Sequence, residues 1–162
     1  MAESEEKNVS YAIDRTLSID GVSSQRIVLS GPANEWRGVW QSGFEVVGGK
    51  EYAGYAWIKA EPANQRVSFT LERRDGTTLA RSEASLQPGD WHRYDFKITP
   101  VNGLHPAVFR ILFNHLGIVW IGGASLMPGD HIDGFRREVL ELAKTMAPPI
   151  LRWPGRRFSG YL

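Results

Sequence analysis

The chain of 162 residues contains no cysteine, so disulfides, thiolate metal sites and cysteine nucleophiles are excluded. It has no apolar run near the roughly 20 residues that a membrane-spanning helix needs, so we expect no membrane partner. The chain also lacks an excess of one charge, because it has 19 Lys and Arg residues and 18 Asp and Glu residues, which gives a net charge of +1. Such a balanced chain gives no electrostatic case for a nucleic-acid partner. The first residues, M-A-E-S-E-E-K-N, lack the basic start and apolar run of a secretory signal, which leaves localisation open.

Common catalytic and metal-binding motifs are missing as well. The four histidines follow neither an HxxxH nor an HxH spacing, which argues against a zinc site. Ser and His are present, but no G-x-S-x-G elbow holds a nucleophile. We therefore predict no catalytic residue, no metal ligand and no cofactor. One metal alternative stays open, a structural calcium bound by the acidic N-terminal strand.

Helical periodicity is absent before residue 130, and short alternating segments separated by turn residues take its place. About nine strands are expected: near 9–13, at 25–30, two within 35–60, and at 66–72, 77–85, 91–99, 107–113 and 117–126. Regularly spaced short strands with turn signals between them are typical of an antiparallel β-sandwich or jelly roll. We predict a mainly β protein in which residues 1–7 are disordered and residues 8–127 form the sandwich.

Residues 133–147 change to apolar positions at helical spacing, and Pro148 and Pro149 stop the helix. Asp130 or Asp133 is expected to cap it. A short apolar strand follows at 150–153. A helix and a strand appended to a finished sandwich suggest that 128–162 begin a second domain that was cut off. We expect this tail to dock on its own sandwich or to form a homodimer, because its apolar face otherwise stays exposed.

Residues 35–60 hold three of the six tryptophans, around a turn at Gly48-Gly49. Trp36 and Trp40 lie four apart and share one face of a strand, while Tyr55 and Trp57 share the non-core face of a neighbouring strand. Tryptophan and tyrosine rings stack on the flat C–H faces of sugars, and polar side chains bond the hydroxyls. The candidate carbohydrate-binding residues are Trp36, Trp40, Tyr55 and Trp57, with Arg37, Gln41, Lys59 and Glu72 within reach.

A packing role for the same rings is the competing interpretation. Trp36 or Trp40 would then fill the core, and Tyr55 and Trp57 would be covered by a loop or by the C-terminal tail. The remaining tryptophans of the sandwich, Trp91 and Trp120, are expected to be structural.

Several segments carry a family resemblance. They are G-G-K-E-Y-A-G-Y-A-W-I-K-A at 48–60, G-D-W-H-R-Y-D-F-K-I-T at 89–99, F-R-I-L-F at 109–113 and I-V-W-I-G-G-A-S-L at 118–126. With these segments, residues 35–127 resemble the carbohydrate-binding, galactose-binding-like jelly roll found beside many glycosidases. The closing strand of such modules often reads I-D-D-V, with an aspartate that can serve a structural calcium. Here Gly122 and Gly123 stand at that point and offer no side-chain oxygen.

A second segment, S-L-M-P-G-D-H-I-D-G-F-R-R-E-V-L-E-L-A-K-T-M-A-P-P-I-L-R-W-P-G at 125–155, is similar to the early (β/α) barrel of family 51 α-L-arabinofuranosidases. The resemblance matches Arg152 to an arginine on the floor of that family's active site. It also implies two catalytic glutamates on later barrel strands, a part of the barrel that this chain lacks. Retaining glycosidases need both carboxyl groups about 5 Å apart.

These observations predict a non-catalytic module that binds plant cell-wall polysaccharide by aromatic stacking, with xylan, arabinoxylan, arabinan and β-glucan as the candidate ligands. The chain by itself is not expected to be an enzyme. The alternative is a structural accessory domain of an α-L-arabinofuranosidase without sugar affinity of its own.

Overall fold

The computed structural model describes residues 8–31, 35–62, 66–101 and 103–147. The chain divides into two compact units, Met1–Gly129 and Asp130–Leu162. The N-terminal segment predicted to be disordered (1–7), the strand predicted at 150–153 and Arg152 lie outside the described ranges.

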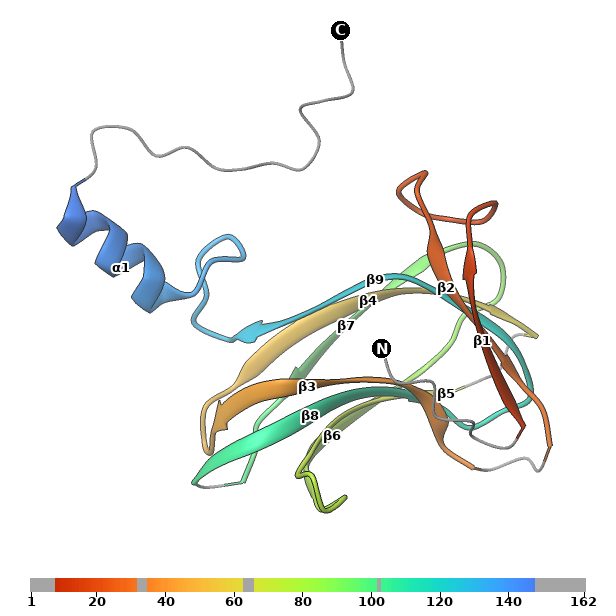
Figure 1. Ribbon diagram of the computed structural model, residues 1–162, viewed down its shortest axis with the longest axis horizontal. Helices are drawn as coiled ribbons and strands as arrows, with labels where there is room; N and C mark the ends of the chain where they lie inside the picture. The colour runs from red at the N-terminus through yellow and green to blue at the C-terminus, as the bar shows by residue number, and fades with distance from the viewer. Residues whose placement is uncertain (1–7, 32–34, 63–65, 102, 148–162) are drawn as a thin grey trace, which may run out of the picture. The chain divides into compact units, whose positions relative to one another are not determined.

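Nine strands build the first unit, all within its described residues. They are β1 (Val9–Asp14), β2 (Ser24–Leu29), β3 (Arg37–Val47), β4 (Tyr52–Glu61), β5 (Arg66–Glu72), β6 (Thr78–Ser85), β7 (His92–Ile98), β8 (Leu104–Phe113) and β9 (Gly117–Pro128). They pair antiparallel in a five-stranded sheet, β1-β2-β9-β4-β7, and a four-stranded sheet, β3-β8-β5-β6. Figure 1 shows the two sheets as stacked layers. The predicted mainly β sandwich with a C-terminal helix is confirmed.

The core lies between the inner faces of the two sheets. Alternate residues of each strand point inward because successive side chains of a strand leave on opposite faces. Phe69 of β5 stacks on Phe96 of β7 with ring centroids 4.1 Å apart, and Phe109 of β8 lies 5.7 Å from the same Phe96 ring. Phe69 is fully buried. These rings join the two layers. Tyr52 of β4 belongs to the same core and Phe44 of β3 packs against it, so the core is filled without Trp40, Tyr55 and Trp57.

The two strands of residues 35–60 enter different sheets. β3 is an edge strand of the four-stranded sheet, whereas β4 lies between β9 and β7 in the five-stranded sheet. The Lys50 N–H donates to the Val47 carbonyl across the turn between them, yet β3 and β4 do not pair as a hairpin. The N–H groups of Gly48 and Gly49 donate to the carbonyls of Gly103 and Pro100 in another loop. The prediction that these strands are neighbours in one sheet is therefore wrong, and rings on β3 and β4 do not share one platform.

One end of the sandwich is closed by a contact between edge strands of opposite sheets. The Tyr11 hydroxyl of β1 donates to the Gly38 carbonyl of β3 over 2.8 Å. Gly38 is also held close to β8, since a Cβ added there would lie 2.1 Å from the Ile111 carbonyl oxygen. A side chain at residue 38 would push β3 away from its neighbour, so the glycine fixes the place of this edge.

The second unit contains the helix α1, Arg137–Met146. It begins four residues later than predicted, and neither Asp130 nor Asp133 caps it, because the N-cap residue is Arg136 and no side chain makes a capping bond. Asp133 instead has φ 49°, in a turn before the helix. No helix in the described ranges is long and apolar enough to cross a membrane.

The apolar side of α1 is open to solvent within its own unit. Val139, Leu142 and Met146 are 54%, 62% and 72% exposed. The expected docking or homodimerisation of this tail stays a prediction.

Candidate functional site

The eight candidate residues, four rings and four polar side chains, occupy several separate places. Trp36 and Trp40 lie on the outer face of the four-stranded sheet, because they alternate with the inward Val39 and Gln41. Tyr55, Trp57 and Lys59 lie on the outer face of the five-stranded sheet. Arg37 is buried, and Gln41 lines a groove between the sheets.

Trp40 is the most accessible of the four predicted rings, with 48% of its surface exposed. Its cross-strand neighbour on β8 is Arg110, and Arg110 in turn pairs with Thr70 on β5. No hydrogen bond or ring contact within the described residues occupies the Trp40 indole. One face of the ring is thus available for a ligand.

An ion pair lies beside this ring. The Arg110 Nε atom is 2.7 Å from Glu72 Oε2, and the two side chains are 32% and 12% exposed. Both residues face outward on the four-stranded sheet, so charged hydrogen-bonding groups stand next to an open aromatic surface. Sequence reasoning included Glu72 but missed Arg110, although its outward position within F-R-I-L-F is a usable signal.

Trp36 is more enclosed than Trp40. The Arg81 guanidinium of β6 lies 5.6 Å from the centroid of its ring, in a cation–π arrangement. On the same outer face Ser68 and Thr70 of β5 are fully buried, with their hydroxyl oxygens 2.9 Å apart. Both residues face outward by alternation along β5, so an outward position on this sheet does not by itself mean exposure to solvent. Trp36 therefore packs against Arg81 on the outer face, and neither it nor Trp40 belongs to the buried core cluster, where the competing interpretation put one of them.

Arg37 is a structural residue in this arrangement. Its side chain is only 5% exposed, and its guanidinium donates to the backbone carbonyls of Asn8 and Ser30. Ser30 N–H donates to the same Asn8 carbonyl. These bonds tie the start of β3 to the residue just before β1 and the residue just after β2, so the guanidinium does not face a ligand on the outer surface.

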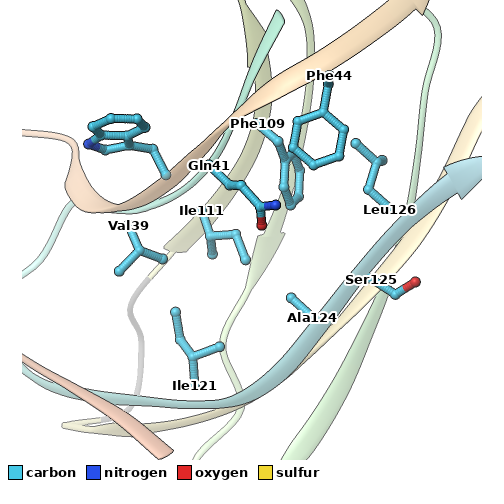
Figure 2. Close-up of a pocket in the computed structure, with 10 residues that line it drawn as sticks. Val39, Gln41, Phe44, Phe109, Ile111, Ile121, Ala124, Ser125 and Leu126 are labelled. Atoms are coloured by element: carbon cyan, nitrogen blue, oxygen red, sulfur yellow. The ribbon is translucent and has the colours of Figure 1, made fainter. Parts of the chain in front are cut away.

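A groove of about 190 Å³ opens where the edge strand β3 faces β9. Its lining residues are Val39, Trp40, Gln41, Phe44, Phe109, Ile111, Ile121, Ala124, Ser125 and Leu126. Figure 2 shows the Gln41 carboxamide directed among apolar side chains, near Phe109 and Ile111, while the Ser125 hydroxyl points away. The register of β3 shifts between Gln41 and Phe44, which marks a bulge at this edge.

The outer face of the five-stranded sheet holds the other pair of rings. The Arg93 guanidinium lies 4.2 Å from the Tyr55 ring centroid and also pairs with Asp95 at 2.8 Å, so one face of Tyr55 is covered. Trp57 is half-buried and lies opposite Gly123 of β9. A Cβ added at Gly123 would meet nothing within 4 Å, so there is open space beside the Trp57 ring.

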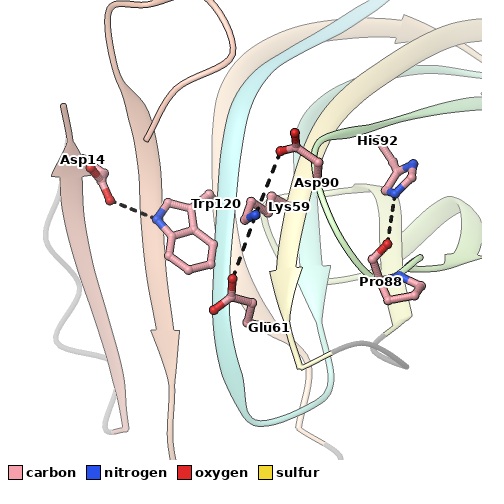
Figure 3. A network of polar contacts seen from close by, with 7 residues as sticks. All are labelled: Asp14, Lys59, Glu61, Pro88, Asp90, His92 and Trp120. Atoms are coloured by element: carbon pink, nitrogen blue, oxygen red, sulfur yellow. Dashed lines mark hydrogen bonds and ion pairs between the residues drawn. The ribbon is translucent and has the colours of Figure 1, made fainter. Parts of the chain in front are cut away.

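Lys59, at the end of this face, is engaged by acidic residues. Its ammonium lies 3.9 Å from both Glu61 and Asp90 (Figure 3). Trp120, on the same outer face, is 7% exposed and donates from Nε1 to Asp14 over 3.0 Å, as Figure 3 also shows. Trp120 is thus structural, as predicted, and Lys59 is held by two neighbouring carboxylates.

The Asp14 carboxylate organises the loop that follows β1. Thr16 donates to it from its hydroxyl and its backbone N–H, and Leu17 donates from its backbone, all within 3.0 Å. The Thr16 hydroxyl bond, followed by these backbone bonds and the Trp120 indole, holds the pKa of Asp14 well below its usual value. No group of three or more His, Asp or Glu side chains able to hold a metal ion occurs within the described part of the chain.

No protein-family model and no curated protein matches the chain. Among solved structures it is similar to the arabinose-bound α-L-arabinofuranosidase MgGH51, with a TM-score of 0.73 and 16% identity over 92% of this chain. It is also similar to the CBM22-1–GH10 modules of Clostridium thermocellum endo-1,4-β-D-xylanase 10B complexed with xylohexaose (TM-score 0.58, 12% identity, 77% of this chain). A third is the CBM22-1 xylan-binding domain of Paenibacillus barcinonensis Xyn10C (TM-score 0.58, 13% identity, 78% of this chain).

The chain corresponds to a small part of two of these proteins and to most of the third. The chain spans 27% of the arabinofuranosidase and 25% of the xylanase modules, but 85% of the xylan-binding domain. At these identities the likeness shows the fold alone, a β-sandwich of two antiparallel sheets.

Proposed function

We propose that this chain is a non-catalytic carbohydrate-binding module, and that it binds plant cell-wall polysaccharide on the outer face of the four-stranded sheet. The observation that carries the proposal is the half-exposed Trp40 ring beside the Arg110–Glu72 ion pair. A sugar stacked on the indole would place its hydroxyl groups within reach of a guanidinium and a carboxylate. Charge-assisted hydrogen bonds of this kind are stronger than neutral ones and fix the orientation of a ligand.

The ligand class follows from what the similar proteins are described as binding. One is a xylan-binding domain, one was solved with xylohexaose, and one is an arabinofuranosidase with arabinose. Xylan and arabinoxylan are therefore the first ligands to test, followed by arabinan and β-glucan.

Trp40 is the principal anchor in this proposal, with Trp36 extending the surface if Arg81 swings aside. The rings on the opposite sheet, Tyr55 and Trp57, form a second candidate surface, bounded at one end by Lys59. Gln41 contributes from the groove side of β3. Arg37, buried at the strand end, would act only by holding β3 in place.

A second candidate function is a structural accessory domain of an α-L-arabinofuranosidase. It is favoured by the match of 92% of this chain to 27% of such an enzyme. In that case the outer face of the five-stranded sheet, with Trp57 and the open space above Gly123, is the surface that would contact the rest of the enzyme.

Isothermal titration calorimetry and affinity electrophoresis against xylan, arabinoxylan, arabinan and β-glucan test the proposal. Saturable binding to at least one of them is expected for a binding module. Absence of binding to all four by a folded protein would refute the binding module and favour the accessory domain.

A further inference from the structure

The groove between β3 and β9 is not used by stacking on Trp40, and its chemistry differs from that of the outer face. We propose that it binds an aromatic ester substituent carried by the polysaccharide chain. This inference rests on the proposed carbohydrate-binding function and names the kind of polysaccharide that the module selects.

The size and walls of the groove suit a single aromatic group. Its volume of about 190 Å³ corresponds to roughly six water molecules at about 30 Å³ each. Phe44 and Phe109 meet edge to face with centroids 6.3 Å apart and form an aromatic wall. Val39, Ile121 and Leu126 supply aliphatic surface. A sugar ring would have to bury several hydroxyls here without partners, which is costly, whereas an aromatic ring would not.

Gln41 gives the groove one polar contact. Gln41 is exposed, and its carboxamide lies at the open side of the groove beside Phe109 and Ile111 (Figure 2), where no described residue hydrogen-bonds it. An amide N–H₂ donates well to a carbonyl oxygen. A ligand that is apolar except for one carbonyl matches this arrangement, and an aromatic ester has that composition. Small-molecule sites commonly combine apolar walls with a few such polar groups.

The groove continues from the proposed sugar platform around the free edge of β3. Trp40 borders the groove and also lies on the outer face, while its neighbour Gln41 points to the opposite side of the strand. The bulge that follows, with Gly43 at φ 91°, bends this edge where the groove opens. A polysaccharide stacked on Trp40 can therefore direct a substituent over the edge and into the groove.

A matched ligand pair tests the inference. Calorimetry would compare a xylo-oligosaccharide carrying one feruloyl ester with the same oligosaccharide after saponification. We expect the ester to tighten binding about tenfold. Ala124→Leu, which fills the open groove, should abolish this preference and leave the Kd for the saponified chain unchanged. Gln41→Leu should reduce the preference, whereas Gln87→Leu, the same change on an exposed loop, should not.

A probe without sugar separates failure of the inference from failure of the proposed function. Methyl ferulate alone, titrated into labelled protein, should shift the backbone amide resonances of residues 39–44 and 121–126 in the wild type and not in Ala124→Leu. Equal affinity for the two oligosaccharides, with no shift by methyl ferulate, would overturn the groove site while the module still binds sugar. If methyl ferulate shifts these resonances but neither oligosaccharide binds, the groove site stands and the proposed function fails.

Discussion

Replacing Trp40 with alanine removes an open ring from the outer face of the four-stranded sheet and leaves the core intact. The ring is 48% exposed, so about half of its surface is buried by the protein. If a tryptophan buries up to about 250 Å², the loss is roughly 130 Å², or about 3 kcal/mol at 25 cal/mol per Å², which is an upper estimate. Since domains of this size are stable by about 5–15 kcal/mol, the variant should remain folded.

Ligand binding by Trp40→Ala should weaken even though the variant stays folded. An aromatic anchor at a binding surface typically contributes about 2 kcal/mol, which corresponds to a roughly 30-fold increase in Kd. Calorimetry with the polysaccharide that binds best measures this change, and circular dichroism confirms the fold. Trp40→Phe keeps a ring in place and should lose less than about fivefold. Trp57→Ala makes the same change on the second candidate surface, on the opposite sheet, and should bind as the wild type does because the principal anchor is Trp40.

The reasoning fails if Trp40→Ala binds with wild-type affinity. Loss of binding in Trp57→Ala together with unchanged binding in Trp40→Ala would move the ligand to the outer face of the five-stranded sheet. Loss in both variants would mean that a single anchor ring does not account for binding.

Three further predictions concern the ion pair, the core and the β1 loop. Glu72→Gln removes the charge that pairs with Arg110, so affinity should fall about tenfold and the free energy of unfolding by about 1 kcal/mol; unchanged affinity by calorimetry would remove the pair from the site. Phe69→Ala empties the space stacked on Phe96 and should cost about 3–5 kcal/mol in urea unfolding, and a cost below about 1 kcal/mol would contradict the described core. Because the folded-state pKa of Asp14 is lowered, wild type should be more stable than Asp14→Asn above about pH 4, and the difference should vanish as pH falls further. An equal difference between the two urea midpoints at pH 7 and at pH 2 would show that the ionised Asp14 carboxylate is not the cause.

Individual strands were predictable because alternation is a local property. Residues 66–72 alternate Val67, Phe69 and Leu71 with polar residues, and these three side chains are fully buried in β5. A strand places successive side chains on opposite faces whichever strand it pairs with, so the pattern is legible before the partner is known. The helix type was predictable for the same reason, whereas its first residue was not.

The candidate site was predictable only in part. Alternation put the Trp40 ring on an outer face, but Ser68 and Thr70, also outward, are fully buried. Trp36 and Arg81 come from opposite edges of the sheet and meet in a cation–π contact on that face, which no local pattern shows. The Arg110–Glu72 pair likewise joins residues on two paired strands whose register was unknown from sequence.

The sequence by itself determined that the chain is built from short antiparallel strands, and that more rings lie in residues 35–60 than one core requires. Only the tertiary structure decided that β3 and β4 belong to opposite sheets, because each strand pairs with strands far away in the sequence and the Gly48-Gly49 turn also bonds to a distant loop. Side-chain direction is set by local backbone geometry, but the face that a side chain shares with others depends on contacts far apart in the chain. For that reason the sequence could name Trp40 and Trp57, and only the fold shows that they lie on separate surfaces.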